Sequence, residues 1–563
     1  MVAAARRYRS VASGGYPRSI AENMVTIPTR LGLDARGYLA LLLLLFIVRG
    51  IQIQCLYPPL EGPDEYQHIA YLVYLDEQHR PPVYGQAVVP PSLYPNLVDN
   101  PHSEHDWQQT RGIGALRYEQ FYDTPPSQIG SSAISLYQAQ HPPLYYILMS
   151  PVFIRLQKLF GFRVAVYALR FLNILLAGIA MVWLLAPLQS LFKDVGLFRP
   201  VALAISLSPM FMIYVSRVAN DALALAFVGA AVWLLMHWPT GRFPRASAAL
   251  VGGLLGLGTL TKLITVSLLP AALAYLLFLA LCARVKWFTA VLGVVMIVST
   301  YFVFTLPFLV KNIQHYRVPF VTQEAIINGQ NGKSFVDSFR AIRADHIESF
   351  FVGRLIQENL WTSGWSFLMP DRLFVNAYSW ILVIAFGGLL AGVYRIWAKQ
   401  IPISAVPFNA VVMSVLIVIF TALAAYIHAL SAILAWGIIV TPSYYVMVGY
   451  PAFLICAFAA ARGYGRNAVL GLAVALTLIF LATEYHSLLW KGAMHWAHSN
   501  NWVEIFNRLA NIHPAFLSPW FFFPLATFVI LLVAFLVWHN WLVYSQRTAI
   551  SPMTPLPLVG DGM

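Results

Sequence analysis

The sequence predicts an all-α, polytopic membrane protein with about twelve transmembrane helices. Of its 563 residues, 59% are hydrophobic and 10% are charged, and the mean hydropathy is +0.67. Soluble domains usually carry about a quarter charged residues. The apolar residues also gather in runs of about 18 to 26, the length at which a helix crosses a bilayer. Composition and run length together indicate a body embedded in a membrane.

Apolar runs divide the chain into a central body, residues 37–543, and two polar tails, residues 1–36 and 544–563. The first run, Gly37–Tyr57, lacks a small-residue cleavage site and is predicted to be a retained span. The other runs are 142–160, 164–187, 199–216, 222–237, 246–261, 263–283, 287–310, 377–394, 406–427, 431–461, 467–485 and 518–543. Since almost no loop separates the two runs at Lys262, the count of crossings is twelve or thirteen.

Basic residues at the ends of these runs predict the orientation, because cytoplasmic loops are enriched in Lys and Arg. If every run crosses and the N-terminus is inside, nine basic residues mostly fall outside the cytoplasm. They return to the cytoplasm if 142–160 lies along the outer interface instead of crossing. The nine are Arg242, Arg245, Arg284, Lys286, Arg395, Lys399, Arg462, Arg466 and Arg547. We therefore predict about twelve crossings, cytoplasmic tails and a juxtamembrane helix at 142–160.

This orientation places three large loops outside the cytoplasm, at 58–163, 311–376 and 486–517. Carboxylates gather in the first two. Of the 23 Asp and Glu residues, ten lie between Glu61 and Asp123 and six in 311–375. The outer face is therefore where carboxylate chemistry is expected, and the first loop is its richest part.

The formal charge of +13 does not indicate a nucleic-acid partner, because the basic residues stand singly or in pairs at span ends. The cluster of Arg6, Arg7 and Arg9 is typical of a cytoplasmic anchor facing anionic lipid. The three cysteines lie in or beside apolar runs, so no disulfide framework follows. The sequence has no Asn-x-Ser/Thr acceptor, which favours a bacterial inner membrane over a eukaryotic secretory one.

The first candidate site follows the first span and reads Glu61-Gly-Pro-Asp64-Glu65-Tyr-Gln-His68. Pro63 suits the first helical position, which would put Asp64 and Glu65 in the first turn and His68 on the same face as Asp64. A carboxylate beside a histidine at the membrane edge can act as a general base or bind a cation. An ordinary helix start prefers the same residues for capping and dipole reasons.

Further charged residues are embedded between spans near the predicted outer face. Asp221 follows Arg217 in a short turn, and ionisable groups at membrane depth mark functional sites more often than not. Its alternative role is to cap that turn. Arg49, Arg170 and Lys262 are embedded cations that, together, would hold a phosphate. The alternative for each is a long stem that reaches to the interface.

These residues resemble the motifs of the class C glycosyltransferases (GT-C), polytopic enzymes that take a sugar from a polyprenyl-phosphate carrier. The resemblance lies in Pro63-Asp64-Glu65, the run His141–Tyr146 that reads His-Pro-Pro-Leu-Tyr-Tyr, Arg170, and Asp221 at the second outer turn. The set is similar to protein O-mannosyltransferases and lipid A aminoarabinose transferases. It is most similar to a group of predicted bacterial transferases that carry Pro-Pro-Asp-Glu-x-x-His and His-Pro-Pro-Leu-Tyr. The segment Trp361-Thr-Ser-Gly-Trp365 also resembles that group.

The resemblance implies a function and a set of site residues. It implies transfer of a sugar from a polyprenyl-phosphate donor to a lipid, glycan or protein acceptor at the outer face, with inversion. Asp64 takes the catalytic position, with Glu65 beside it. Asp64 and Asp221 are the ligands of a divalent cation, if one is used. The substrate-binding positions are His68, His141, Arg170, Arg217, Asp221 and Lys262.

One feature of the resembling group is missing, and two rival functions stay open. The group often carries Gly-Arg-Tyr before a late span, whereas this chain has Pro442-Ser443-Tyr444-Tyr445, so no late donor-binding Arg is implied.

A lipid or solute transporter or flippase would usually show internal repeats and helices broken near mid-membrane. An O-antigen ligase or polymerase-like protein would carry its functional loop late in the chain, whereas the richest loop here comes first.

Overall fold

The computed structural model describes residues 35–103, 118–123, 133–192, 195–237, 245–333, 336–337, 347–363, 368–398, 400, 408–437 and 445–550. Within these ranges the regular structure is helical, and extended segments meet only in two isolated bridges, Val88–Ser135 and Ser363–Leu368. Most of both predicted tails and the Pro442–Tyr444 stretch lie outside the described residues. The contacts reported below belong to one compact unit, residues 39–563.

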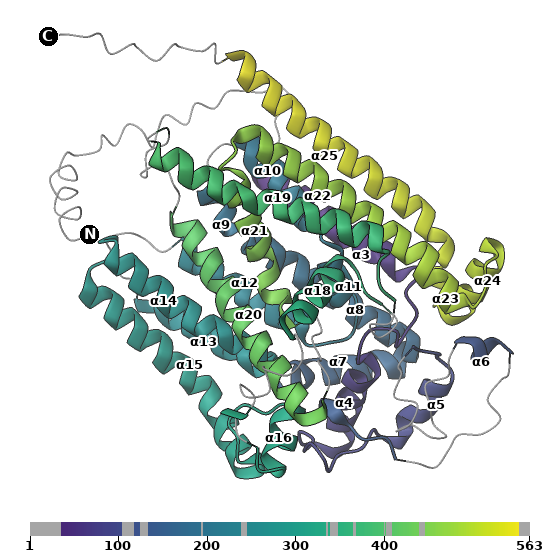
Figure 1. Cartoon of the computed structure of the whole chain (residues 1–563). Helices are drawn as coiled ribbons and strands as arrows, with labels where there is room; N and C mark the ends of the chain where they lie inside the picture. Colours follow the sequence, from purple (N-terminus) through teal and green to yellow (C-terminus); the bar gives the residue numbers. More distant parts are fainter. Residues whose placement is uncertain are drawn as a thin grey trace, which may run out of the picture. The chain divides into compact units, whose positions relative to one another are not determined.

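Eight segments of the described chain are long and apolar enough to cross a membrane (Figure 1). They are built on α3 (Ala35–Gln54), α8 (Phe162–Leu184), α14 (Leu268–Leu281), α15 (Trp287–Tyr316), α19 (Arg372–Trp397), α20 (Phe408–Trp436), α22 (Arg466–His486) and α25 (Phe522–Ile550). A ninth arises if α10 (Val195–Ser206) and α11 (Pro209–Val215), bent by 49°, form one broken span. The expected multi-pass helical class is confirmed, and the count of about twelve stays a prediction.

Shorter helices lie between these segments, and two of them, α4 (Glu65–Gln78) and α7 (Leu144–Phe160), are described below. Two of them, α12 (Asp221–Met236) and α21 (Tyr450–Ala461), are apolar, and α13 (Arg245–Thr261) occupies a third predicted run. The others are η1 (Pro91–Leu93), α5 (Tyr94–Val98), α6 (Tyr118–Asp123), η2 (Tyr137–Gln140), α9 (Ala186–Leu191), η3 (Leu263–Ser267), α16 (Gln323–Gln330), α18 (Ile347–Leu360), η7 (Met447–Gly449), η8 (Ser487–Ala493), α23 (Met494–Ala497), α24 (Trp502–Ile512), η9 (Ala515–Leu517) and η10 (Pro519–Phe521).

One predicted boundary is wrong. Helix α20 continues through 428–430 to Trp436, where the sequence pattern predicted a break between two spans. His428, the polar residue at the predicted break, packs against the Tyr445 ring at 4.1 Å and lies 3.9 Å from Glu324. Residues 486–517, predicted to form the third outer loop, contain helices, since α22 continues through η8 into α23 and α24 follows. Their position outside the membrane stays a prediction.

The segment predicted to lie along the outer interface forms α7, Leu144–Phe160. It is not among the candidate spans, and its Arg155 and Lys158 are exposed. Its buried face packs on α4 (Glu65–Gln78) and on α8, which brings the end of the first loop against its beginning (Figure 1). The helix is as predicted, and its placement at the interface stays a prediction.

Helix α13 carries Lys262 immediately after its last residue and is held close to α15 by glycine. A Cβ added at Gly252 would lie 2.3 Å from the carbonyl oxygen of Ile297, and one at Gly256 would lie 3.1 Å from that of Tyr301. Small residues let membrane helices approach at their backbones. This close pair, with α12 and α8 packed against one another beside it, sets where Lys262 and Asp221 meet.

Candidate active site

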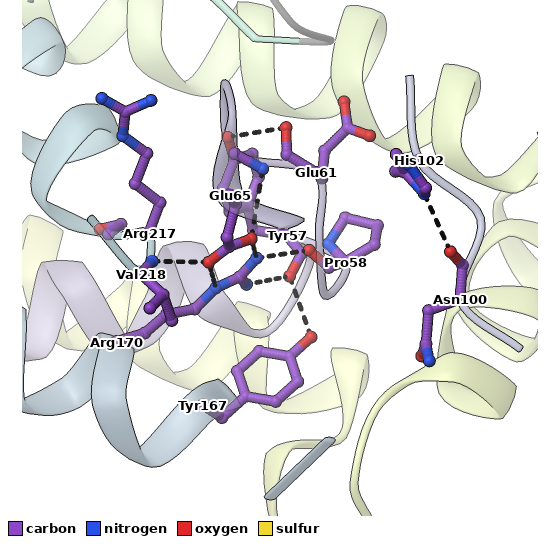
Figure 2. Close-up of polar contacts among 12 residues, drawn as sticks. Tyr57, Pro58, Glu61, Glu65, Asn100, His102, Tyr167, Arg170, Arg217 and Val218 are labelled. Carbon is purple, nitrogen blue, oxygen red and sulfur yellow. Dashed lines mark hydrogen bonds and ion pairs between the residues drawn. The ribbon is translucent and has the colours of Figure 1, made fainter. Parts of the chain in front are cut away.

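The loop between α3 and α4 folds around one buried ion pair, Glu65 with Arg170 (Figure 2). Arg170 makes five hydrogen bonds: two to Glu65, one to the Gln54 side chain, and one each to the carbonyls of Tyr57 and Pro58. A guanidinium has five N–H donors, so every one of them is used within the protein. Both side chains are fully buried. Arg170 therefore shapes the loop, and its expected contact with a phosphate stays a prediction.

Glu65 also fastens a second chain segment, the turn at 216–221, to this loop. Its Oε1 accepts from the Val218 backbone N–H at 2.6 Å (Figure 2). Its Oε2 accepts from Gly62 N–H at 3.4 Å. The approach is tight, because a Cβ at Gly62 would lie 2.6 Å from Cβ of Arg217. Counting its two bonds from Arg170, the carboxylate has its acceptor sites filled. Its contacts give Glu65 a positioning role, and its expected catalytic role stays a prediction.

Asp221 begins α12 and forms the second buried ion cluster. Its Oδ2 accepts from Arg217 at 2.8 Å and its Oδ1 contacts the ammonium of Lys262. Arg217 also donates to the carbonyl of Pro63, and Asn220 donates to the carbonyl of Thr261 at 2.8 Å. The Lys262 ammonium lies 5.9 Å from the centre of the Tyr445 ring. The cluster thus joins the first loop to the start of α12 and the end of α13.

Asp64 differs from the two buried carboxylates, because it is partly exposed while Glu65 and Asp221 are buried. The helix begins at Glu65, two residues later than the proline position predicted, and Asp64 takes a left-handed conformation with φ 59°. Such a φ is uncommon outside glycine and is enriched at functional sites. The Asp64 side chain does not cap α4; its Oδ1 accepts from the Tyr137 hydroxyl at 2.8 Å. It lies close enough to Lys262 to interact with it electrostatically.

Two histidines from the two ends of the first loop stack beside these charges. The rings of His68 and His141 are 5.8 Å apart and nearly parallel, and His68 Nδ1 lies 2.7 Å from the Tyr146 hydroxyl. Tyr71 stacks on Tyr146 at 3.8 Å. Burial, with the nearby positive charge of Lys262, lowers the pKa of His141 to about 3. Both rings are therefore neutral at neutral pH, since burial also holds the pKa of His68 well below its usual range.

The structure brings the predicted site residues together around the start of α4. Asp64, Glu65, His68, His141, Arg170, Arg217, Asp221 and Lys262 are linked by the contacts above. Arg49, expected among these cations, belongs to another cluster. It pairs with Glu484 at 2.7 Å and binds the carbonyls of Ser206 and Leu207, which the break between α10 and α11 leaves without helical partners.

The residues present do not fit the divalent ion considered for Asp64 and Asp221. Both oxygens of Asp221 already face cations, Arg217 and Lys262, which a metal ion would have to displace. In the described ranges no three His, Cys, Asp or Glu residues are placed to hold a metal ion. We assign no metal ligand.

Glu61 is a site residue that the sequence analysis did not single out, although it belongs to the same motif. It is fully buried and accepts from the Ser103 backbone N–H at 3.1 Å, the Ser103 hydroxyl at 2.9 Å and the Tyr118 hydroxyl at 2.8 Å. The Ser103 hydroxyl also lies 2.9 Å from His495 Nε2. Burial raises the pKa of Glu61 to about 7. These partners are distant in sequence, so only the fold reveals them.

Fold and site define a multi-pass helical membrane protein with buried ion pairs gathered at the start of its first large loop. No protein-family profile matches the chain, and no curated protein sequence matches it.

Solved structures show a distant likeness. The chain is 13% identical to the apo oligosaccharyltransferase of Archaeoglobus fulgidus, with TM-score 0.44 over 81% of this chain and 56% of that one. It is also 13% identical to the archaeal oligosaccharyltransferase AglB from Archaeoglobus fulgidus in complex with an inhibitory peptide and a dolichol-phosphate, with TM-score 0.40 over 91% of this chain and 55% of that one. It is 14% identical to ArnT of Cupriavidus metallidurans bound to undecaprenyl phosphate, with TM-score 0.29 over 77% of this chain and 79% of that one. The chain spans about half the length of the archaeal enzymes. Likeness at these TM-scores is too weak to assign a function.

Proposed function

We propose that this protein is an integral membrane glycosyltransferase that moves a sugar from a polyprenyl-phosphate donor to an acceptor on the outer face of the membrane, with inversion. The observation that carries the proposal is the state of Asp64. It is partly exposed, is held in a left-handed conformation and leaves its helix uncapped, all within a cluster of buried ion pairs. A partly exposed carboxylate beside buried cations and without a capping role is a candidate for chemistry.

The chemistry of the donor requires only a base and positive charge from the protein. A sugar linked to a lipid phosphate is already activated, so transfer needs a base for the acceptor hydroxyl and positive charge for the departing phosphate. Asp64 is the base. In the proposal Lys262 supplies that positive charge, because its ammonium interacts electrostatically with Asp64. Attack by the acceptor on the face opposite the phosphate inverts the anomeric carbon.

A groove for the lipid chain lies near Lys262. It is a cavity of about 450 Å³ between α18, α19, α20 and α21, with mostly apolar lining that includes Leu355, Leu382 and Phe453. No charged residue lines it. Val446, which lines it, follows Tyr445, whose ring centre lies 5.9 Å from the Lys262 ammonium. In the proposal the polyprenyl chain occupies this groove and its phosphate faces Lys262.

Asp64→Asn tests the proposal. Asn keeps the size of the side chain and can still accept from Tyr137, but it cannot take a proton. The loss of a positioned base typically slows a reaction about 10²–10⁴-fold. The assay is sugar transfer from polyprenyl-phosphate donors by the purified full chain in nanodiscs, with thermal stability measured beside it. Asp76→Asn, the same change at the exposed end of the same helix, is the control and should leave transfer unchanged. Transfer by Asp64→Asn at the wild-type rate would rule out the assignment.

One observation favours a second candidate, a lipid or solute transporter. Transporters use broken helices near mid-membrane, and α10 and α11 are bent by 49°. In such proteins the freed carbonyls coordinate substrate ions, whereas here the carbonyls of Ser206 and Leu207 bind Arg49. Uptake or flipping of lipid by reconstituted vesicles of both wild type and Asp64→Asn, without sugar transfer by either, would establish the transporter.

A further inference from the structure

A second cavity, distinct from the lipid groove, opens beside His141. Its volume is about 320 Å³. Gln140 and His141 of the first loop line one part of it, and Lys311 and Tyr316 of α15 line another. Leu260, two residues before Lys262, also lines it, which places the cavity next to the buried ion cluster. The two cavities share no lining residue.

Lys311 is the charged residue that lines this cavity. Its side chain is half-buried near the end of α15, and its ammonium makes no hydrogen bond or ion pair with another described residue. The other buried cations around the site are all matched: Arg170 by Glu65, and Arg217 and Lys262 by Asp221. An ammonium on a cavity wall without a carboxylate beside it attracts an anionic ligand.

The remaining lining matches a small polar ligand with a ring. The aromatic side chains of Tyr71, Tyr316 and Phe308 provide flat apolar faces, and Gln140 and Asn312 provide amides. Ligand sites combine apolar and aromatic walls with a few polar groups in this way, and the volume is at the lower end of their range. A sugar-sized group with one negative charge satisfies both the walls and Lys311.

We propose that this cavity binds the acceptor and that Lys311 selects an acceptor with a phosphate or carboxylate group. The inference rests on the proposed function and extends it by naming the substrate class. The lipid groove contains no charged residue, so the apolar chain of the donor belongs there and the anionic acceptor belongs here. His141 lies between the acceptor cavity and the cluster, since it lines the cavity and stacks on His68.

A binding experiment tests the proposal without catalysis. The purified full chain in nanodiscs is titrated with glucose 6-phosphate and with glucose, and the shift of the unfolding temperature is recorded. Glucose 6-phosphate should stabilise the wild type at concentrations where glucose does not. Lys311→Gln should weaken its binding by about tenfold or more, and Lys311→Arg should keep most of it. Lys286→Gln, the same change at the other end of α15, is the control for general surface charge.

Two further arms separate the possible outcomes. Saturating undecaprenyl phosphate should leave the glucose 6-phosphate shift in place, because the donor occupies another site. Loss of that shift by competition would place the donor phosphate at Lys311 and overturn the acceptor assignment. Equal stabilisation by glucose, or unchanged binding in Lys311→Gln as for a side chain that merely reaches to the interface, would overturn the role of Lys311. Asp64→Asn should bind glucose 6-phosphate normally, so its transfer rate tests the proposed function separately.

Discussion

We predict that Glu65→Gln mainly lowers the stability of the protein and has no direct effect on sugar transfer. The wild-type carboxylate accepts from Arg170 at 2.8 and 2.5 Å and from Val218 N–H at 2.6 Å, with neither Glu65 nor Arg170 exposed to solvent. A Gln amide supplies only one acceptor oxygen and points its NH₂ group at other donors, and it leaves the guanidinium charge without a partner. Removing one member of a buried ion pair costs about 3–5 kcal/mol. The free energy of unfolding of a protein is typically about 5–15 kcal/mol, so this cost is a large fraction of it.

The assay is the apparent Tm of the detergent-solubilised full chain at a fixed heating rate, measured beside sugar transfer. Glu65→Gln should lower the apparent Tm by about 2–4 °C, whereas Glu77→Gln, at an exposed position of the same helix, should change it little. Adding Arg170→Gln to Glu65→Gln should cost less than the sum of the two single changes, because the pair removes both buried charges. A Glu65→Gln protein with wild-type Tm and greatly reduced transfer would refute the positioning role and restore a catalytic one.

Three further predictions concern other parts of the chain. Because burial raises the pKa of Glu61 to about 7, its contribution to stability is present below the ordinary glutamate pKa and is lost as the pH rises through 7. The apparent Tm should therefore fall between about pH 5 and pH 8, and Glu61→Gln should remove that fall; an unchanged profile in the variant contradicts it. In intact cells, a membrane-impermeant maleimide should label Gln86→Cys and should spare the exposed native Cys282 until the membrane is permeabilised, and the reverse pattern would invert the proposed topology. Asp221→Asn should lower the apparent Tm because it leaves buried cations unpaired, and adding Lys262→Gln should recover part of the loss; no recovery would mean that the pair is not coupled.

The sequence by itself determined the class of fold and the region of the site. Apolar runs of bilayer length need no tertiary information, because the hydrocarbon core demands helices with internally satisfied backbones. The predicted runs match helices along most of the described chain, including α7 at Leu144–Phe160. The order Asp64, His141, Arg170, Asp221 along the sequence also pointed to the cluster, since Asp64, His141 and Asp221 lie just outside a run and Arg170 is a charge embedded in one.

Only the tertiary structure decided what each charged residue does. Sequence spacing treats Asp64 and Glu65 as equivalent neighbours, yet one is partly exposed and the other is sealed against Arg170. Arg170 and Lys262 were both expected to hold phosphate, whereas their counter-ions come from positions 105 and 41 residues away. Only the fold shows that Lys311, which has no ion-pair partner among the described residues, lines a cavity together with Gln140 and His141 of the first loop. Charge pairing in a buried site depends on which segments meet in space. The order of residues along the chain does not give the distance between two charged groups in the folded protein.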